Sequence, residues 1–129
     1  MRKRVDMSAV ILVVDDEPGV RDMLCDALSI AGYQPISAKD GFAAHLLLRD
    51  VKVDLIITDI NMPNMGGLEL IRHVKALPGF RFVPILTLTT ESDAGKRDEG
   101  KRLGATGWLV KPIAGAELLK VIKQVLPGA

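Results

Sequence analysis

Short apolar runs alternate with longer amphipathic segments along this chain, and this alternation constrains the fold more than any other feature. The apolar runs occupy residues 9–14, 34–37, 53–58, 82–88 and 107–110. They are nearly continuous and rich in Val and Ile, which is typical of parallel strands that are covered on both faces. The segments between them have the length of helices and occupy residues 18–31, 41–49, 67–77, 91–103 and 114–126. Five strand–helix units in 129 residues predict an α/β fold, a doubly wound parallel sheet with helices on both faces.

Local signals mark the ends of the first two helices. Pro18 suits the first turn of a helix and Gly32 suits its end, while Asp40 is a good cap for the second helix. The apolar spacing predicts that the first helix turns five side chains toward the core: Val20, Met23, Leu24, Ala27 and Leu28.

Composition excludes several classes of protein. Hydrophobic residues make up 48% of the chain, which argues against disorder, and the net charge of +1 gives no reason to expect nucleic acid. No apolar run approaches the ~20 residues of a membrane span, so no membrane insertion is expected. The single cysteine, Cys25, permits no internal disulfide, is expected to serve packing, and favours a cytoplasmic location. We expect a flexible tail at residues 1–7, one domain at residues 8–129 with no separate output domain, and a monomer.

Polar residues stand where the predicted strands end. They are Asp15 and Asp16 after the first run, Asp59 after the third, Thr89 and Thr90 after the fourth, and Lys111 after the fifth. The carboxyl ends of parallel strands lie along one edge of the sheet, where open α/β sheets bind their ligands. These residues are therefore expected to converge on one site.

The residue types in that site point to phosphoryl transfer. Three clustered carboxylates repel one another unless a cation joins them, and Mg²⁺ prefers oxygen ligands and phosphate oxygens. Asp59 can serve as a nucleophile, while a metal ion and Lys111 neutralise charge on the transferred group. An aspartate at a strand end often has only a capping role, which Asp15 or Asp16 could fill near Pro18. The agreement of four strand ends favours the site.

Four short segments resemble the response-regulator receiver domain. They are residues 15–17 (DDE), 57–63 (ITDINMP), 89–91 (TTE) and 107–112 (GWLVKP), and the resemblance covers about residues 8–126. It implies a flavodoxin-like sheet of five strands in the order 2-1-3-4-5, with five helices. It also implies that the chain is a phosphoacceptor that catalyses only its own phosphorylation and dephosphorylation.

The resemblance assigns roles to individual residues. Asp59 would be the phosphoacceptor, with Thr89 and Lys111 holding the phosphoryl oxygens. Asp16, Asp59 and the main-chain carbonyl of Asn61 would bind Mg²⁺ directly, and Asp15 would act through water. The Lys111–Pro112 bond would be cis, an isomer whose cost is low before proline.

A switch and an output surface are also implied. Thr89 would move toward the phosphoryl group and Trp108 would turn inward, although Thr90 and Trp108 both differ from the residues most common there. The output surface would include Arg97 and Lys101, cationic residues of a glycine-containing fourth helix that would meet an acidic partner. Asn61 and Glu91 resemble the residues of fast-decaying CheY-type chemotaxis regulators.

The leading hypothesis is therefore a CheY-type regulator that is phosphorylated by a CheA-type histidine kinase and read by the flagellar motor switch protein or a phosphatase. A phosphorelay shuttle or phosphate sink is the first alternative. A Mg²⁺-dependent aspartyl phosphatase is less favoured, because no second aspartate stands two residues after Asp59. A flavin-binding protein is disfavoured by the acidic loop at residues 15–18. His45 and His73 lie on predicted helices, away from the strand ends, and are not expected to carry phosphate.

Overall fold

A five-stranded parallel sheet forms the centre of the computed structural model, which describes residues 9–90 and 94–126. Strands and helices alternate along the described chain. The strands are β1 (Val10–Val14), β2 (Gln34–Ala38), β3 (Leu55–Asp59), β4 (Ile85–Thr89) and β5 (Gly107–Val110). The helices are α1 (Pro18–Ile30), α2 (Gly41–Leu48), α3 (Gly67–Ala76), α4 (Ala94–Leu103) and α5 (Gly115–Val125). The strand order is β2-β1-β3-β4-β5, which confirms the predicted flavodoxin-like topology.

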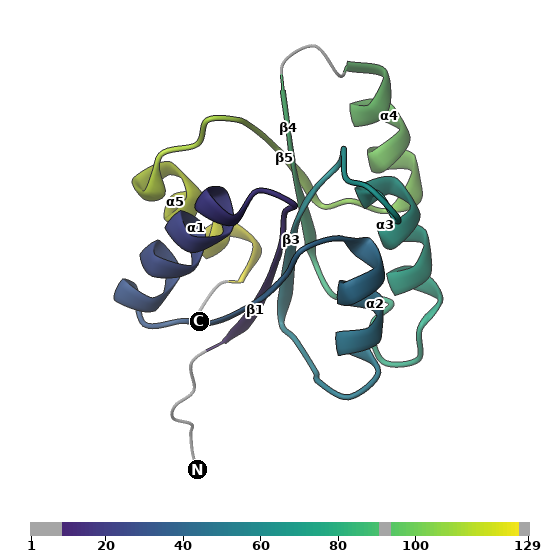
Figure 1. The fold of residues 1–129 in the computed structure, drawn as a ribbon, viewed down its shortest axis with the longest axis horizontal. Helices are drawn as coiled ribbons and strands as arrows, with labels where there is room; N and C mark the ends of the chain where they lie inside the picture. The colour runs from purple at the N-terminus through teal and green to yellow at the C-terminus, as the bar shows by residue number, and fades with distance from the viewer. Residues whose placement is uncertain (1–8, 91–93, 127–129) are drawn as a thin grey trace.

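Two apolar clusters lie on opposite faces of this sheet. Helices α1 and α5 cover one face, and α2, α3 and α4 cover the other (Figure 1). Alternate residues of the central strands enter different clusters: Leu55 and Ile57 pack with α1 and α5, whereas Ile56 packs with α2 and α3. This double burial explains why the sequence of β3 is apolar at every position before Thr58.

The predicted fourth strand begins too early. Residues 82–84 were expected to belong to it, but the ladder starts at Ile85, which pairs with Ile56. Pro84 has no N–H to donate, and the Val83 N–H bonds to the Phe80 carbonyl in a turn. Phe82 is 87% exposed. The third strand likewise begins at Leu55 rather than at residue 53.

The inward face of α1 also differs from the prediction at one position. Leu24 and Leu28 are buried as expected, but Met23 is 50% exposed. Its side chain lies in a groove between α1 and the β5–α5 connection, together with Pro112 and Ile113. The core-facing side of α1 is therefore narrower than the apolar spacing indicated.

Other expectations have mixed outcomes. The expected tail at residues 1–7 and the expected first turn of the fourth helix, residues 91–93, lie outside the described residues. The Lys111–Pro112 bond is cis, and Asp40 caps α2 by accepting a hydrogen bond from the Ala43 N–H, both as predicted.

None of the described helices is both long enough and apolar enough to cross a lipid bilayer.

Candidate functional site

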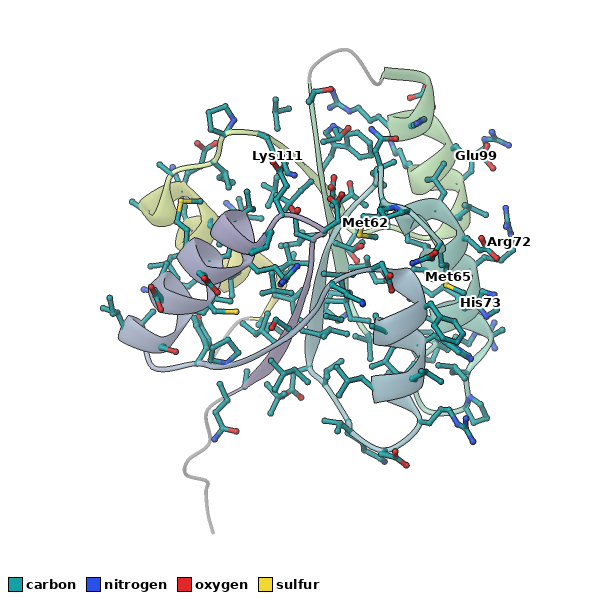
Figure 2. The ribbon with its side chains drawn as sticks, viewed as in Figure 1. Met62, Met65, Arg72, His73, Glu99 and Lys111 are labelled. Atoms are coloured by element: carbon teal, nitrogen blue, oxygen red, sulfur yellow. The ribbon has the colours of Figure 1, made fainter. Side chains whose placement is uncertain are left out.

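The carboxyl edge of the sheet gathers the polar residues that the sequence placed at strand ends. Asp59 and Thr89 are the last residues of β3 and β4, and Asp15 and Lys111 directly follow β1 and β5. Because these strands are neighbours in the sheet, residues from position 15 to position 111 meet at one edge. Lys111 and Met62 of the β3–α3 loop are both labelled in Figure 2.

Three aspartates form an acidic cluster there. One carboxylate oxygen each of Asp15, Asp16 and Asp59 lies within 4.8 Å of the other two. Asp15 and Asp59 are buried, while Asp16 is exposed to solvent. The predicted convergence of these side chains is therefore present, with one open side.

Lys111 is the cation of this cluster. Its Nζ lies 2.9 Å from Asp15 Oδ2 and 3.4 Å from Asp59 Oδ2, with Glu17 Oε1 also at 3.4 Å. Burial alone would lower the pKa of Lys111, but the short contact with the Asp15 carboxylate and the charge of Asp59 outweigh burial, so the pKa is raised. The ammonium is therefore fully charged at neutral pH and is shared among three carboxylates.

Asp59 is held in a fixed orientation with a raised pKa. Its Oδ1 accepts a 2.8 Å hydrogen bond from the Ile60 N–H, and the neighbouring Thr58 hydroxyl donates to the Asp59 carbonyl at 2.9 Å. Burial, and then the charge of Asp15, raises the pKa of Asp59 to about 6, although Lys111 opposes the shift. One ammonium is not enough to offset two buried carboxylates.

Asp15 also supports the start of α1. Its Oδ1 accepts a 3.0 Å hydrogen bond from the Glu17 N–H, and its main-chain carbonyl accepts one of 2.7 Å from Arg21 Nη1. Asp15 does not cap the helix, because the N-cap of α1 is Glu17 and no side chain caps it. Its Oδ1 instead orders the turn before the helix. The other oxygen, Oδ2, faces Lys111.

The donor set of this cluster fits a hard divalent cation. Asp15 Oδ2 is buried and accepts no hydrogen bond of good geometry from the described residues, which leaves its charge facing the cluster. Asp16 and Asp59 supply further carboxylate oxygens at close range. Oxygen-only ligands with an exposed side suit Mg²⁺, which retains several of its water molecules.

Close backbone packing fixes the loop that follows Asp59. The Gly67 N–H donates to the Ile60 carbonyl at 2.9 Å, which seats the N-terminus of α3 beside β3. A second link joins the loop to α2, since Asn64 Nδ2 donates to Asp40 Oδ2 at 2.8 Å. The hydrogen bond from the Ala43 N–H is the main reason that the pKa of Asp40 is lowered.

The expected switch residues lie beside this edge. Thr89 is buried at the end of β4, whereas Thr90 is exposed, and Glu91 lies outside the described residues. Trp108 is half-buried in β5, opposite Thr87. Its ring lies close to Gly100 of α4. A groove of about 500 Å³ lies beside it, and its lining includes Arg97, Asp98, Lys101 and Trp108.

Lysine 96 is a neighbour of the site that the sequence did not indicate. Its Nζ donates a hydrogen bond to Asn61 Oδ1, from the first turn of α4 to the loop after Asp59. A lysine in the first turn of a helix is disfavoured by the helix dipole. This unfavourable position is the sequence signal that could have indicated a nearby negative or polar partner for Lys96. The Asn64–Asp40 link was also missed, because it requires Asn64 to adopt a positive φ of 68°.

The remaining reactive side chains lie elsewhere. His45 of α2 and His73 of α3 pack edge to face with ring centroids 5.1 Å apart, and neither belongs to the carboxyl edge of the sheet. Cys25 is half-buried on α1, and burial raises the pKa of its thiol, which is consistent with packing rather than reactivity.

Known proteins with a similar sequence or fold support this description. Residues 11–123 match the response regulator receiver domain family. The chain is 36% identical over 116 residues to the phosphate regulon transcriptional regulatory protein PhoB of Pseudomonas aeruginosa, an alignment that covers 90% of this chain and 51% of PhoB. The structure of the chemotaxis response regulator CheY4 of Vibrio cholerae superposes with a TM-score of 0.88 and 43% identity, covering 92% of this chain and 99% of CheY4.

A third similar protein carries a metal. The receiver domain of a sensor histidine kinase from Pseudomonas aeruginosa has a magnesium ion coordinated in its active site cleft; it superposes with a TM-score of 0.85 and 28% identity, covering 92% of this chain and 98% of that one. The chain spans about half the length of the curated relatives it matches. The match over residues 11–123, together with the fold, shows that this chain belongs to the response regulator receiver domain family of two-component signalling.

Proposed function

We propose that Asp59 accepts a phosphoryl group from a histidine kinase, and that Mg²⁺ bound by Asp15, Asp16, Asp59 and the main-chain carbonyl of Asn61 assists the transfer. The observation that carries this proposal is the convergence of Asp15, Asp16 and Asp59 with the Lys111 ammonium at the end of the sheet. Mg²⁺ in such a site neutralises charge on the transferred phosphoryl group.

The side chains divide the remaining work. A carboxylate oxygen of Asp59 forms a bond to phosphorus as the bond from phosphorus to the donor imidazole nitrogen breaks, and the imidazole takes up a proton. The Ile60 N–H donates a hydrogen bond to the other carboxylate oxygen of Asp59, Oδ1, and so fixes the orientation of the nucleophile. Lys111, 3.4 Å from Asp59 Oδ2, moves toward the new phosphoryl oxygens, and Thr89 donates its hydroxyl to them.

The raised pKa of Asp59 has a direct role in this scheme. A pKa of about 6 in the metal-free protein means that the carboxylate is not fully stabilised by Lys111. A divalent cation held by Asp15, Asp16 and Asp59 would favour the charged form of the Asp59 carboxylate at neutral pH.

We further propose a chemotaxis-type output that is read on the surface formed by α4, β5 and α5. The 43% identity to CheY4 and the nearly complete coverage of that chain support this assignment. The groove between Trp108 and α4, with Arg97 and Lys101 on its wall, offers cations to an acidic motor-switch segment. A CheA-type kinase would be the phosphate donor.

A transcriptional regulator is the second candidate, because the curated relatives include PhoB proteins of about twice the aligned length. In that case the same receiver would control an attached effector domain. A phosphorelay shuttle or phosphate sink would instead return the phosphoryl group to a histidine of another protein.

Trp108 gives a direct test of phosphoacceptance. The protein is titrated with beryllofluoride in the presence of Mg²⁺, and a change in Trp108 fluorescence is expected in the wild type but not in Asp59→Asn. Mass spectrometry after incubation with acetyl phosphate should show one added phosphoryl group that Asp59→Asn lacks. If both proteins behave alike in both measurements, Asp59 is not the acceptor.

The output is tested separately with the phosphorylated protein. Binding of a motor-switch peptide only after phosphorylation supports the chemotaxis assignment. Transfer of the phosphoryl group to a histidine phosphotransfer protein, without peptide binding, would support a relay instead.

A further inference from the structure

Lys96 brings a second cation to the outer side of the candidate phosphorylation site. It is the third residue of α4, and its Nζ donates a hydrogen bond to Asn61 Oδ1, which lies 35 residues earlier in the chain. Asn61 stands two residues after Asp59. The contact therefore joins the first turn of α4 to the loop that carries the nucleophile.

The position of this lysine is costly for the helix. The N-terminus of a helix carries a partial positive charge, which favours acidic residues and disfavours lysine in the first turn. The first turn of α4 has no acidic residue among its described positions and places Lys96 beside Arg97. The negative charge of the aspartate cluster, only partly offset by Lys111, provides a nearby compensation.

The burial pattern places this contact on the solvent side of the acceptor. Asp59 is 6% exposed, whereas Asn61 and Lys96 are both classed as exposed side chains. A water molecule that attacks a phosphoryl group on the buried Asp59 has to enter from the exposed edge of the site, to which Asn61 and Lys96 belong. The Lys96–Asn61 contact is therefore in a position to restrict its approach.

We propose that Lys96 is a positioning residue that holds Asn61 over the site and prolongs the phosphorylated state of Asp59. This proposal rests on the phosphoacceptor role proposed above. Phosphorylation adds nearly two negative charges beside Asp59, so the attraction of the Lys96 ammonium to this edge increases when the group is present. In hydrolysis a water oxygen bonds to phosphorus, the bond from phosphorus to the Asp59 oxygen breaks, Asp59 leaves as a carboxylate, and the water protons pass to phosphate and solvent.

Removing the ammonium should shorten the lifetime of the phosphorylated protein. Lys96→Gln is expected to hydrolyse its acyl phosphate about three- to tenfold faster, the range expected from the net contribution of one exposed hydrogen bond. The same variant should bind beryllofluoride more weakly by a similar factor. Lys96→Arg keeps the charge and the donor and should restore most of both properties.

Two controls separate this role from general charge and from folding. Lys52→Gln removes the same charge from an exposed position before β3, at the opposite end of the sheet, and should leave both properties unchanged. Asn61→Ala removes the acceptor, so the effects of Lys96→Gln and Asn61→Ala should be non-additive in the double variant. Equal melting temperatures of the Lys96 variants and the wild type show that folding is intact.

The decisive measurement is the loss of label from protein that was phosphorylated with ³²P-labelled phosphoramidate in Mg²⁺ buffer. Faster decay of Lys96→Gln, rescue by Lys96→Arg and non-additivity with Asn61→Ala support the proposal. Unchanged decay in Lys96→Gln overturns it while the wild type still labels on Asp59, which leaves the phosphoacceptor role intact. A wild type that takes up no label overturns both.

Discussion

The backbone of Gly67 lies directly against the backbone of Asp59. A Cβ built on Gly67 would be 2.3 Å from the Asp59 carbonyl oxygen and 2.9 Å from the Ile60 Cα. These neighbours are main-chain atoms at the buried end of β3 and just after it, so neither can turn aside as a flexible side chain would. The start of α3 is thus set against the strand that presents the candidate nucleophile.

Gly67→Ala is therefore expected to destabilise the protein by about 2–3 kcal/mol, because either α3 or the end of β3 has to shift. The matched variant is Gly95→Ala, since nothing lies within 4 Å of a Cβ at that position of α4. Because Gly95 lies in the first turn of α4, its substitution should change the stability by no more than about 0.5 kcal/mol. Urea unfolding of both variants gives the comparison, and equal midpoints would contradict the close approach at Gly67.

Asp59→Asn should stabilise the metal-free protein at neutral pH. The pKa of Asp59 rises from 3.8 to about 6 on folding, so the folded state binds the proton more tightly than the unfolded chain. Ionisation of Asp59 then lowers the free energy of unfolding as pH rises between those values. The gain in Asp59→Asn should be about 1–2 kcal/mol at pH 7, allowing for water at the open side of the cluster, and should vanish near pH 4.

The measurement is urea unfolding in chelator at a series of pH values, with the exposed Asp22→Asn on α1 as the matched control. Asp22→Asn removes the same charge from an exposed position and should change the stability little. A gain in Asp59→Asn that grew toward low pH would have the wrong sign for a raised pKa.

Asp40 should show the opposite dependence on pH. The hydrogen bond from the Ala43 N–H is the largest cause of its lowered pKa, so its carboxylate stabilises the folded state above pH 3.8 and loses that effect as pH falls through the lowered value. Asp40→Ala should cost about 1–2 kcal/mol at pH 7, the usual cost of losing a helix cap.

Asn64→Gly is the natural partner variant, because glycine tolerates the φ of 68° while removing only the side-chain hydrogen bond to Asp40. Its effect should be smaller than that of Asp40→Ala. In the Asp40→Ala background, Asn64→Gly should lower the free energy of unfolding by little more. If the losses of the two single variants added in full, the two residues would act separately.

Added Mg²⁺ should raise the melting temperature of the wild type, since a ligand that binds only the folded state stabilises it by mass action. Asp16→Asn removes one exposed carboxylate of the cluster and should reduce this rise at a fixed Mg²⁺ concentration. Asp54→Asn is a suitable control, because Asp54 accepts from the Val10 N–H near the start of β1, away from the cluster. A rise of equal size in Asp16→Asn and the wild type would place the ion elsewhere.

The order of the elements and the gathering of Asp15, Asp59 and Lys111 could be predicted from the sequence, because both follow from strand ends in a parallel sheet. The prediction that residues 82–84 belong to a strand was wrong for a local reason. Its apolar residues suited a strand, yet Pro84 lacks a donor and the turn at Phe80 takes the Val83 N–H.

Contacts between residues far apart in the chain could not be predicted from the sequence. Lys96 and Asn61 are 35 residues apart, and their meeting depends on where α4 docks beside α3. The exposure of Met23 likewise depends on the width of the gap between α1 and the β5–α5 connection. The spacing of apolar residues along α1 cannot predict that width. Such features arise from how the helices settle on the sheet rather than from the character of any one segment.

The sheet keeps its two apolar clusters apart, since the apolar side chains of β3 alternate between them, with Leu55 and Ile57 in one and Ile56 in the other. Substitutions in Leu24 and Val74, for example, act on groups with no shared neighbours, so their energetic costs should add. Changes in the packing of α1 and α5 should therefore require little compensating change in the packing of α2, α3 and α4. The partition makes the domain evolvable as two nearly independent halves around a fixed chemical edge.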